Sequence, residues 1–426
     1  MARCLSTRKP HRKRPFKGLM TMKTLFKRSA FALALLGANQ ALAGGLWLNE
    51  WGDFAGGRAS AGASAGTDEA ATIIHNPAGS ALLKGSQLFL SAGAFIPKVE
   101  FDVDESAPLI GDGDGGQAGL DAPGAAFAYT NDLGSDKWSA GISFGGLSGA
   151  GLDYGNNWAG RYQDTEVELI LLSLAPSVAY KITDKLSVGV KAQYYYSSLD
   201  LKLRAPTSLV TGTEDGRIKL DGDDTGWGYN LGVIYAFSAD TRVGISYQSK
   251  FDIKYDGDLK IKPADLQANS DTELTMAETV RASLHHDLND RLGLDFTVGW
   301  DNWSAMDSVF VAVDTGAGAD LKKNWEDTYH YAAGFQYKLN EDWDLTAGIA
   351  YDTNPVDSHD RTADLPIDRQ VRYNAGARCA LSDTLTVGGY VNYTDLGSAK
   401  IDAHLWSGEY STNEVYSFAV FANWQL

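Results

Sequence analysis

Hydrophobic and polar residues alternate along most of this chain. In residues 292–301 one face carries apolar side chains and the other carries small or polar ones: Leu292, Leu294, Phe296, Val298 and Trp300 on the first, and Gly293, Asp295, Thr297, Gly299 and Asp301 on the second. The same split recurs in residues 329–339, 343–352 and 385–393. A period of two residues is typical of a β-strand. The pattern therefore predicts an all-β protein.

The connections between these segments fall into two classes that follow one another in turn. One class is short and polar: residues 131–137, 182–185, 238–240, 288–290, 339–342 and 381–383. The other class is longer and often acidic: residues 205–226, 262–275, 314–323 and 354–366. Such alternation is typical of a transmembrane barrel, whereas a soluble sandwich mixes both lengths. We predict a transmembrane antiparallel up-and-down β-barrel of about 14 strands over residues 86–426.

The first 43 residues have the features of a secretory signal peptide. Residues 1–28 carry ten Lys/Arg and no acid, an apolar run follows at 30–38, and Ala41-Leu42-Ala43 is a cleavage site. Either Met1 or Met22 fits as the start. Cleavage removes ten of 37 basic residues and none of the 54 acidic ones, which leaves a formal charge of −27. That charge argues against nucleic-acid partners, and the single remaining Cys379 excludes an intramolecular disulfide.

Residues 44–85 do not alternate and are rich in Gly, Ala and Ser. A segment of this length ahead of a barrel is either a disordered tail or a plug, the hatch, that fills the lumen. Its end carries Asn76-Pro77. Because proline fixes φ and asparagine bonds to nearby backbone, this turn is expected to anchor the hatch just before the first strand. The alternative is a passive connector.

Several short motifs occur in an order that resembles one known family. They are Leu48-Asn49-Glu50, Gly57-Arg58-Ala59, Ala61-Gly62 and Asn76-Pro77-Ala78, followed by Gly299 to Trp303, Asn324 to Asp327 and Leu365 to Arg369. The chain is similar over nearly its whole mature length to the FadL-type outer-membrane transporters of long-chain fatty acids and related hydrophobic compounds. The resemblance implies a Gram-negative outer-membrane barrel of fourteen strands, plugged by its amino-terminal hatch.

The resemblance also implies candidate sites for uptake of a hydrophobic molecule. In the family a lumen pocket near the hatch holds the ligand, so Leu46, Trp47, Leu48 and Asn49 are candidate ligand contacts, with anchoring of the plug as the alternative. A kink in the family's third strand opens a lateral door into the bilayer. Here Gly145, Gly146 and Gly149 interrupt the third strand, and glycines in strands mark bulges or simply relieve crowding.

Four cationic residues are expected on the lumen face: Arg281, Arg372, Arg378 and Lys191. Each is a candidate contact for a carboxylate head group. Alternatively, most of them pair with acidic lumen residues. An uncharged hydrocarbon substrate needs none of them, so the sequence leaves the choice between fatty acid and hydrocarbon open.

Other chemistry is less favoured by the sequence. Ser143 lies in a G-x-S-x-G motif, which would indicate a lipase, but inside a predicted strand rather than at an elbow. Adjacent His285 and His286 point to opposite faces of a strand, and the acidic stretch 111–116 lacks the twelfth-position Glu of a calcium loop. We expect no enzyme, cofactor or metal. The partners expected are a hydrophobic small molecule, outer-membrane lipid and lipopolysaccharide, with a monomeric barrel. The rival function is a non-transporting adhesion or structural barrel.

Overall fold

The computed structural model describes residues 46–48, 50–206, 214–262, 266–306, 308–313 and 318–426. All of them belong to one compact unit, residues 37–426. The expected signal peptide, the choice between Met1 and Met22, and Asn49 lie outside the described residues. No helix in the described ranges is long and apolar enough to cross a bilayer.

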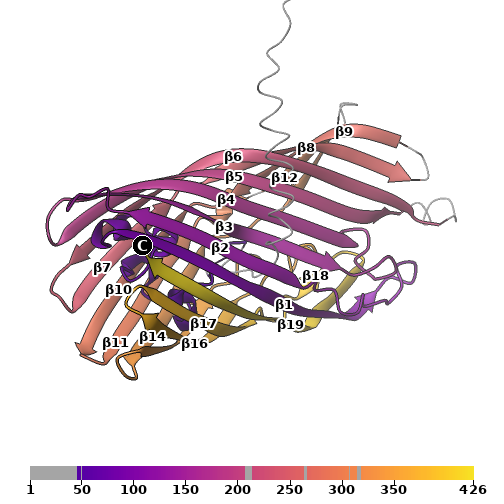
Figure 1. The fold of residues 1–426 in the computed structure, drawn as a ribbon. Coiled ribbons are helices and arrows are strands. Elements are labelled where there is room, and N and C mark those ends of the chain that lie inside the picture. The colour runs from indigo at the N-terminus through magenta and orange to yellow at the C-terminus, as the bar shows by residue number, and fades with distance from the viewer. Residues whose placement is uncertain (1–45, 49, 207–213, 263–265, 307, 314–317) are drawn as a thin grey trace, which may run out of the picture. The chain divides into compact units, whose positions relative to one another are not determined.

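The described residues form one closed antiparallel sheet (Figure 1). Its strands are β1 (Ser86–Ser106), β2 (Ala122–Asn131), β3 (Trp138–Asp153), β4 (Glu166–Lys181), β5 (Leu186–Ala205), β6 (Gly216–Ala236), β7 (Thr241–Gln248), β8 (Phe251–Lys262), β9 (Leu266–Met276), β10 (Thr279–Asn289), β11 (Leu292–Asp301), β12 (Ser308–Val313), β13 (Gly318–Lys322), β14 (Thr328–Lys338), β15 (Trp343–Asp352), β16 (Gln370–Ser382), β17 (Leu385–Asp395), β18 (Ile401–Asp402) and β19 (Trp406–Gln425).

Several of these strands are halves of one longer strand. The pairs β7 with β8, β9 with β10, β11 with β12, β13 with β14, and β17 with β18 follow each other along the same neighbours. Over the described ranges this arrangement gives fourteen wall strands. The barrel closes where β1 pairs with β19, from Gln87↔Gln425 to Ser106↔Trp406. The predicted fold class is confirmed.

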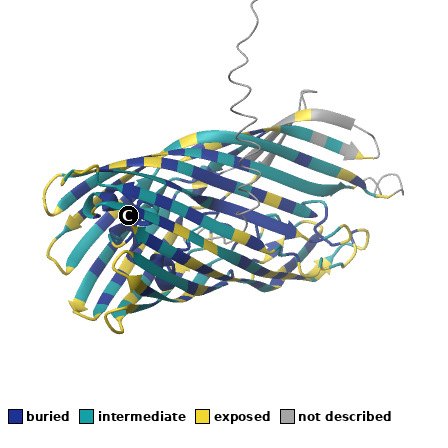
Figure 2. Cartoon of the chain, viewed as in Figure 1, coloured by how far each residue is buried: buried dark blue, intermediate teal, exposed yellow. Residues whose placement is uncertain are grey.

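The barrel wall is apolar outside and polar inside. Figure 2 shows buried and more exposed residues following one another along the strands. On β11, Phe296 and Val298 are 44% and 54% exposed, whereas Asp295 and Asp301 are fully buried. This distribution is the reverse of that in a soluble protein, where apolar side chains fill the interior. The predicted alternation therefore turns its apolar face towards lipid, as a transmembrane barrel requires.

The prediction was wrong about the extent of several long loops. Much of residues 205–226 and 262–275 is strand, because β6 begins at Gly216 and β9 begins at Leu266. Oppositely charged side chains on these strands pair across the sheet, so a stretch that reads as a polar loop continues the hairpins beyond the apolar band. The ion pairs include Lys202 with Glu166 at 2.6 Å, Lys219 with Asp200 at 2.6 Å and Lys260 with Asp221 at 3.5 Å.

The hatch fills the lumen with short helices. They are η1 (Phe54–Arg58), η2 (Ala63–Ala65), α2 (Thr72–His75) and η3 (Pro77–Leu82). Wall side chains satisfy hatch backbone groups: Asn374 Nδ2 donates to Gly56 O at 2.6 Å, and Gly62 N donates to Thr297 Oγ1 at 2.9 Å. Since buried backbone groups need partners, these bonds seat the hatch against the wall.

Candidate functional site

A β-bulge interrupts β3 at the predicted glycines. The register between β3 and β4 shifts between Gly146 and Ser148, which leaves Leu147 as an extra residue. Pairing between β2 and β3 ends at Ala126↔Gly145. Beyond the bulge β3 pairs with β4 on one side and meets residues 118–120, not β2, on the other, and Gly149 lies in that part, opposite Ile170. A bulge bends the strand that carries it.

The bend leaves an opening between β2 and β3, which we call the window. Residues 122–125 of β2 pair with β1, and their other side has no partner strand among the described residues. The window is closed above, where Leu120 N donates to Gly151 O at 3.1 Å. It is therefore a bounded gap in the strand pairing of the wall, with Gly145 and Gly146 beside it.

The start of the hatch meets this bulge. Leu48 N donates to Leu147 O at 2.9 Å, and the Leu48 side chain packs against a small apolar cluster that contains Phe95. A Cβ on Gly145 would approach Trp51 to 3.0 Å, so glycine there gives the Trp51 ring its place. Of the predicted hatch contacts that the structure describes, Leu48 is thus the one bonded to the bulge.

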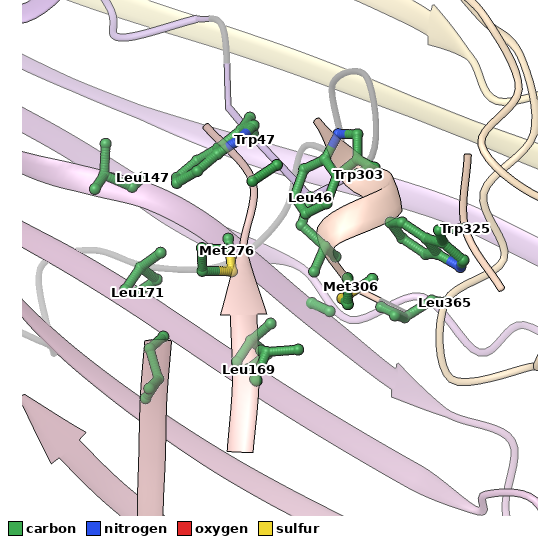
Figure 3. Packing of buried hydrophobic residues seen from close by; sticks show 14 of the residues in the cluster. Leu46, Trp47, Leu147, Leu169, Leu171, Met276, Trp303, Met306, Trp325 and Leu365 are labelled. Carbon is green, nitrogen blue, oxygen red and sulfur yellow. The ribbon is translucent and has the colours of Figure 1, made fainter. Parts of the chain in front are cut away.

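Leu46 and Trp47 belong to a larger apolar cluster inside the barrel (Figure 3). Leu46 is fully buried, and the Trp47 ring lies 6.0 Å from Trp303 and 6.1 Å from Phe251. The described members also include Leu147, Leu169, Leu171, Met276, Met306, Trp325 and Leu365. These residues come from several strands and loops, which is why alternation within one strand could not identify them. Together they form a buried apolar cluster, and apolar side chains of this kind line the sites that bind apolar ligands.

Two cavities meet at the hatch. The first, the polar chamber, has about 840 Å³ of empty space and is lined mostly by hydroxyl, amide and charged side chains. The second, the wall cavity, has about 560 Å³. Leu48 and Trp51 line both. The wall cavity is lined by lumen-facing residues such as Gly93 and also by lipid-facing ones, among them Pro123 and Phe418. It therefore reaches from the lumen to the outer surface beside the window.

Three of the four predicted cations pair with carboxylates. Arg281 binds Asp301 through two bonds of 2.7 and 3.0 Å, and Arg378 Nε bonds Asp344 at 2.9 Å. Arg372 bonds Asp352 and lies 3.6 Å from Glu50. These three match the expected alternative, in which lumen cations neutralise lumen acids.

Lys191 differs from the other three cations. Its Nζ donates to Ile73 O at 3.1 Å and to Ile74 O at 2.7 Å, at the end of α2, and the residue is 2% exposed. Among the described residues, none places a carboxylate within 4.0 Å of this ammonium. Lys191 also lines the polar chamber, as do Ser173 and Asn230, whose Oγ and Oδ1 have no partner in the described structure. The chamber therefore has polar groups available to a ligand.

The Asn76-Pro77 turn is buried between hatch and wall. Asn76 Nδ2 donates to Ser64 O at 2.7 Å and also reaches Val233 O and Ile245 O at 3.2 and 3.3 Å. Its Oδ1 accepts Ala78 N at 3.0 Å and so caps η3, with proline at the first position. Asn76 therefore links this turn to the rest of the hatch and to strands β6 and β7 of the wall.

Sequence reasoning missed an acidic cluster inside the hatch. Asp53 Oδ2 lies 2.7 Å from His75 Nε2, and Asp53 Oδ1 accepts Gly56 N at 3.1 Å. Burial raises the pKa of Asp53, but His75, Arg58 and the Gly56 N–H outweigh burial and hold it below its usual value. Burial, followed by the charge of Asp53, raises the pKa of Glu69 to about 7. Asp53 three residues before Gly56 was a readable helix-capping signal.

The structure shows where the residues considered for lipase and metal chemistry lie. Ser143 lies within β3, opposite Ala128 and Ala175, and not at a strand-to-helix elbow. His285 bonds Asp295 in the lumen, while His286 bonds Thr241 on the other face. Within the described ranges no group of three His, Cys, Asp or Glu residues is arranged to hold a metal ion.

Comparison with known proteins gives consistent matches. A family model described as outer membrane protein transport protein (OMPP1/FadL/TodX) matches residues 34–420. The long-chain fatty acid transport protein of Escherichia coli O6:H1 strain CFT073 is 27% identical over 86% of this chain and 91% of its own length.

Solved structures have the same fold. A Pseudomonas aeruginosa FadL homologue superposes with a TM-score of 0.81 at 19% identity, over 90% of this chain and 100% of that one. The P. putida toluene transporter TodX superposes with a TM-score of 0.70 at 18% identity, over 89% and 99%. At these identities the likeness concerns the fold.

Proposed function

The chain belongs to the OMPP1/FadL/TodX family of outer membrane transport proteins, and from that premise we propose how its own residues carry a hydrophobic molecule across the outer membrane. The cargo enters the apolar cluster, passes the start of the hatch and leaves through the window into the bilayer. Relatives are named for long-chain fatty acids and for toluene, and we take the cargo to be a hydrophobic molecule of one of these two kinds.

The apolar cluster is the proposed capture site. A water-filled pore would not serve a hydrophobic cargo, because exposing apolar surface to water costs about 25 cal/mol per Å². Leu46, Trp47 and the rings around them offer a dry surface instead. Trp47 and Leu147 also line the polar chamber, so a molecule bound at the cluster can reach the chamber without crossing bulk water.

The polar chamber favours a cargo with one anionic end. Lys191 supplies an ammonium group whose bonds go to backbone carbonyls, and a carboxylate is the partner that such a group prefers. The adjoining apolar cluster, which shares Trp47 and Leu147 with the chamber lining, accommodates the rest of such a cargo. We therefore propose a monocarboxylate with a long apolar chain as the cargo, held by Lys191, with Arg281, Arg372 and Arg378 serving mainly their acidic partners.

The observation that carries the lateral route is the wall cavity. Its lining joins Leu48 and Trp51 of the hatch to the lipid-facing residues Pro123 and Phe418. An apolar chain that slides past Leu48 meets hydrocarbon next, so its burial is never interrupted. The bulge at Leu147 is what separates β3 from β2 at this height.

Deletion of Leu147 tests this route. Side chains at odd positions face inward before the bulge and those at even positions after it, so removing one residue restores regular alternation and lets β3 run on beside β2. We expect uptake of labelled oleate by cells to fall to the level of cells that lack the protein. Deleting Leu381, the extra residue of a bulge near the opposite end of the wall, is the matched control. Full uptake by a correctly assembled Leu147 deletion would refute the lateral route.

We also propose that the barrel works as a monomer surrounded by lipid, with lipopolysaccharide against its outer extension. Large apolar side chains are exposed on many strands around the wall, including Val190, Leu231, Ile349 and Val420. The ladder of Lys and Asp side chains on β5, β6 and β8 lies beyond this band. Native mass spectrometry from lipopolysaccharide-containing nanodiscs tests both points, since it reports the subunit number and the bound lipid.

A further inference from the structure

The hatch contains a second polar cavity, which we call the hatch cavity. It has about 280 Å³ of empty space and is lined by Asp53, Arg58, Glu69 and the exposed Asp68. Asp68 lies 3.9 Å from Arg378, whose other partner Asp344 adjoins the short turn at 339–342. The C-terminus lies at the same end of the barrel (Figure 1). The hatch cavity therefore opens towards the periplasmic turns.

A titratable side chain borders both the polar chamber and the hatch cavity. His75 lines the polar chamber and the hatch cavity. Its Nε2 lies 2.7 Å from Asp53 Oδ2. Its other ring nitrogen, Nδ1, has no hydrogen-bond partner among the described residues. A histidine with one nitrogen bonded and the other free can accept a proton on one side and release one on the other.

The charged groups around this pair come from several elements. Asp53 faces His75 and Arg58 of the hatch, while Glu69 faces Asp53, Asp68 and the wall residue Arg378. Tyr390 of β17 lies against η1, where its ring occupies the space that a Cβ on Gly56 would need. The lining of the polar chamber carries the cations Lys191 and Arg281. The hatch cavity holds Asp53, Asp68 and Glu69 together with Arg58, and Arg378 lies beside Asp68.

The proposed cargo meets a difficulty at the window. A carboxylate in the chamber is stabilised by Lys191, but moving an ionised carboxylate into hydrocarbon is far more costly than moving the neutral acid. Buried carboxyl groups commonly escape this cost by taking up a proton. A proton source next to the chamber would therefore lower the barrier to lateral exit.

We propose that Asp53 and His75 relay a proton from the periplasm to the carboxylate of the cargo in the polar chamber, so that the cargo leaves through the window as a neutral acid. This inference rests on the proposed function. The proton comes from periplasmic water, enters by the hatch cavity to Asp53 and passes to His75 Nε2. His75 Nδ1–H then protonates the carboxylate oxygen, forming one O–H bond as the N–H bond breaks, and no electrons are exchanged. Lys191 is released from the neutral head group.

Glu69 fits this role as a proton reservoir. Its carboxylate accepts Phe54 N at 3.0 Å beside Asp53, and burial raises its pKa to about 7. Near neutral pH it therefore holds a proton for part of the time. After each transfer Asp53 is charged again and accepts the Nε2–H of His75, which orients the ring, and the pair then takes up the next proton.

The test compares two cargo molecules of equal chain length, oleic acid and oleyl alcohol, in proteoliposomes or whole cells. The variants are Asp53→Asn, which keeps the cap on Gly56, and His75→Gln. The control is Asp132→Asn in a periplasmic turn. We expect both hatch variants to slow uptake of the acid severalfold and to leave uptake of the alcohol at the wild-type rate. In the wild type, uptake of the acid falls as the periplasmic pH rises, and in Asp53→Asn this pH dependence flattens.

The other possible results overturn either the proton relay or the proposed function. Wild-type rates for both compounds in both variants overturn the relay. Equal loss of both compounds assigns Asp53 and His75 to hatch packing and also overturns it, as does a wild-type protein that carries the acid but excludes the alcohol. If the wild type carries neither compound, the proposed function itself fails.

Discussion

Replacing Asn76 by alanine tests whether this residue anchors the hatch. The side chain is fully buried and makes four hydrogen bonds, to Ser64 O, Val233 O, Ile245 O and Ala78 N. On the wall side, Asn76 Oδ1 fills the space that a Cβ on Gly232 would need. The anchor therefore occupies space that β6 leaves free.

The size of the effect follows from the bonds lost. Removing a helix cap costs about 0.5–2 kcal/mol, and leaving the buried Ser64 carbonyl unsatisfied costs about 1–3 kcal/mol. The contacts to Val233 O and Ile245 O are longer and add less. We expect Asn76→Ala to weaken hatch seating by about 2–4 kcal/mol, which raises the population of the released hatch by about 30- to 1,000-fold.

Hydrogen exchange in nanodiscs measures this population directly. Amides of η1 and η3 that open only with the hatch should exchange faster by the same factor, while those of β1 and β19 keep their protection. The exposed Asn340 in a short turn provides the control, as Asn340→Ala. Unchanged exchange in the hatch of Asn76→Ala would refute the anchor, and faster exchange throughout the barrel would show that Asn76 stabilises the wall instead.

Three further predictions concern the lumen. Lys191→Gln should weaken binding of oleate and leave binding of oleyl alcohol unchanged in calorimetry, and equal loss for both would contradict the head-group role. Trp47→Ala removes a ring that is 3% exposed and should cost about 3–5 kcal/mol of cluster packing, seen as a lower melting temperature and weaker cargo binding. Glu69 has a pKa near 7 in the hatch against an ordinary 4.5, so its contribution to seating is complete below about pH 4.5 and is lost as the pH rises through about 7. Hydrogen-exchange protection of the Phe54 amide should fall over this range, and Glu69→Gln should abolish the dependence.

The fold could be predicted because each wall strand carries its own signal. A lipid-facing row and a lumen-facing row alternate residue by residue, as at Phe296 and Asp295, and this pattern does not depend on any distant contact. The extended parts of the hairpins lack this alternating signal, so the sequence prediction missed them. Above the bilayer both faces are polar, so Lys219 and Asp221 look like a loop until their partners on neighbouring strands are known.

The candidate sites were predictable to the extent that their signals are local. The glycines before Leu147 marked the bulge, but which neighbour β3 loses there depends on register, which alternation does not fix. Likewise, Asp53 and His75 are 22 residues apart and meet only once the hatch folds. The partners of Arg281, Arg372 and Arg378 were foreseeable as acids in general, whereas the particular acids depend on which strands lie side by side.

The hole beside β3 has a consequence for the energetics of transport. In hydrocarbon a stretch of sheet edge is costly because its donors have no partners. Here the rim is already satisfied in part: Pro123 carries no N–H, and the Leu147 carbonyl receives the Leu48 amide. In the lateral route proposed above, such a rim would stay open without a moving part, and a downhill concentration gradient would be enough to drive the flow.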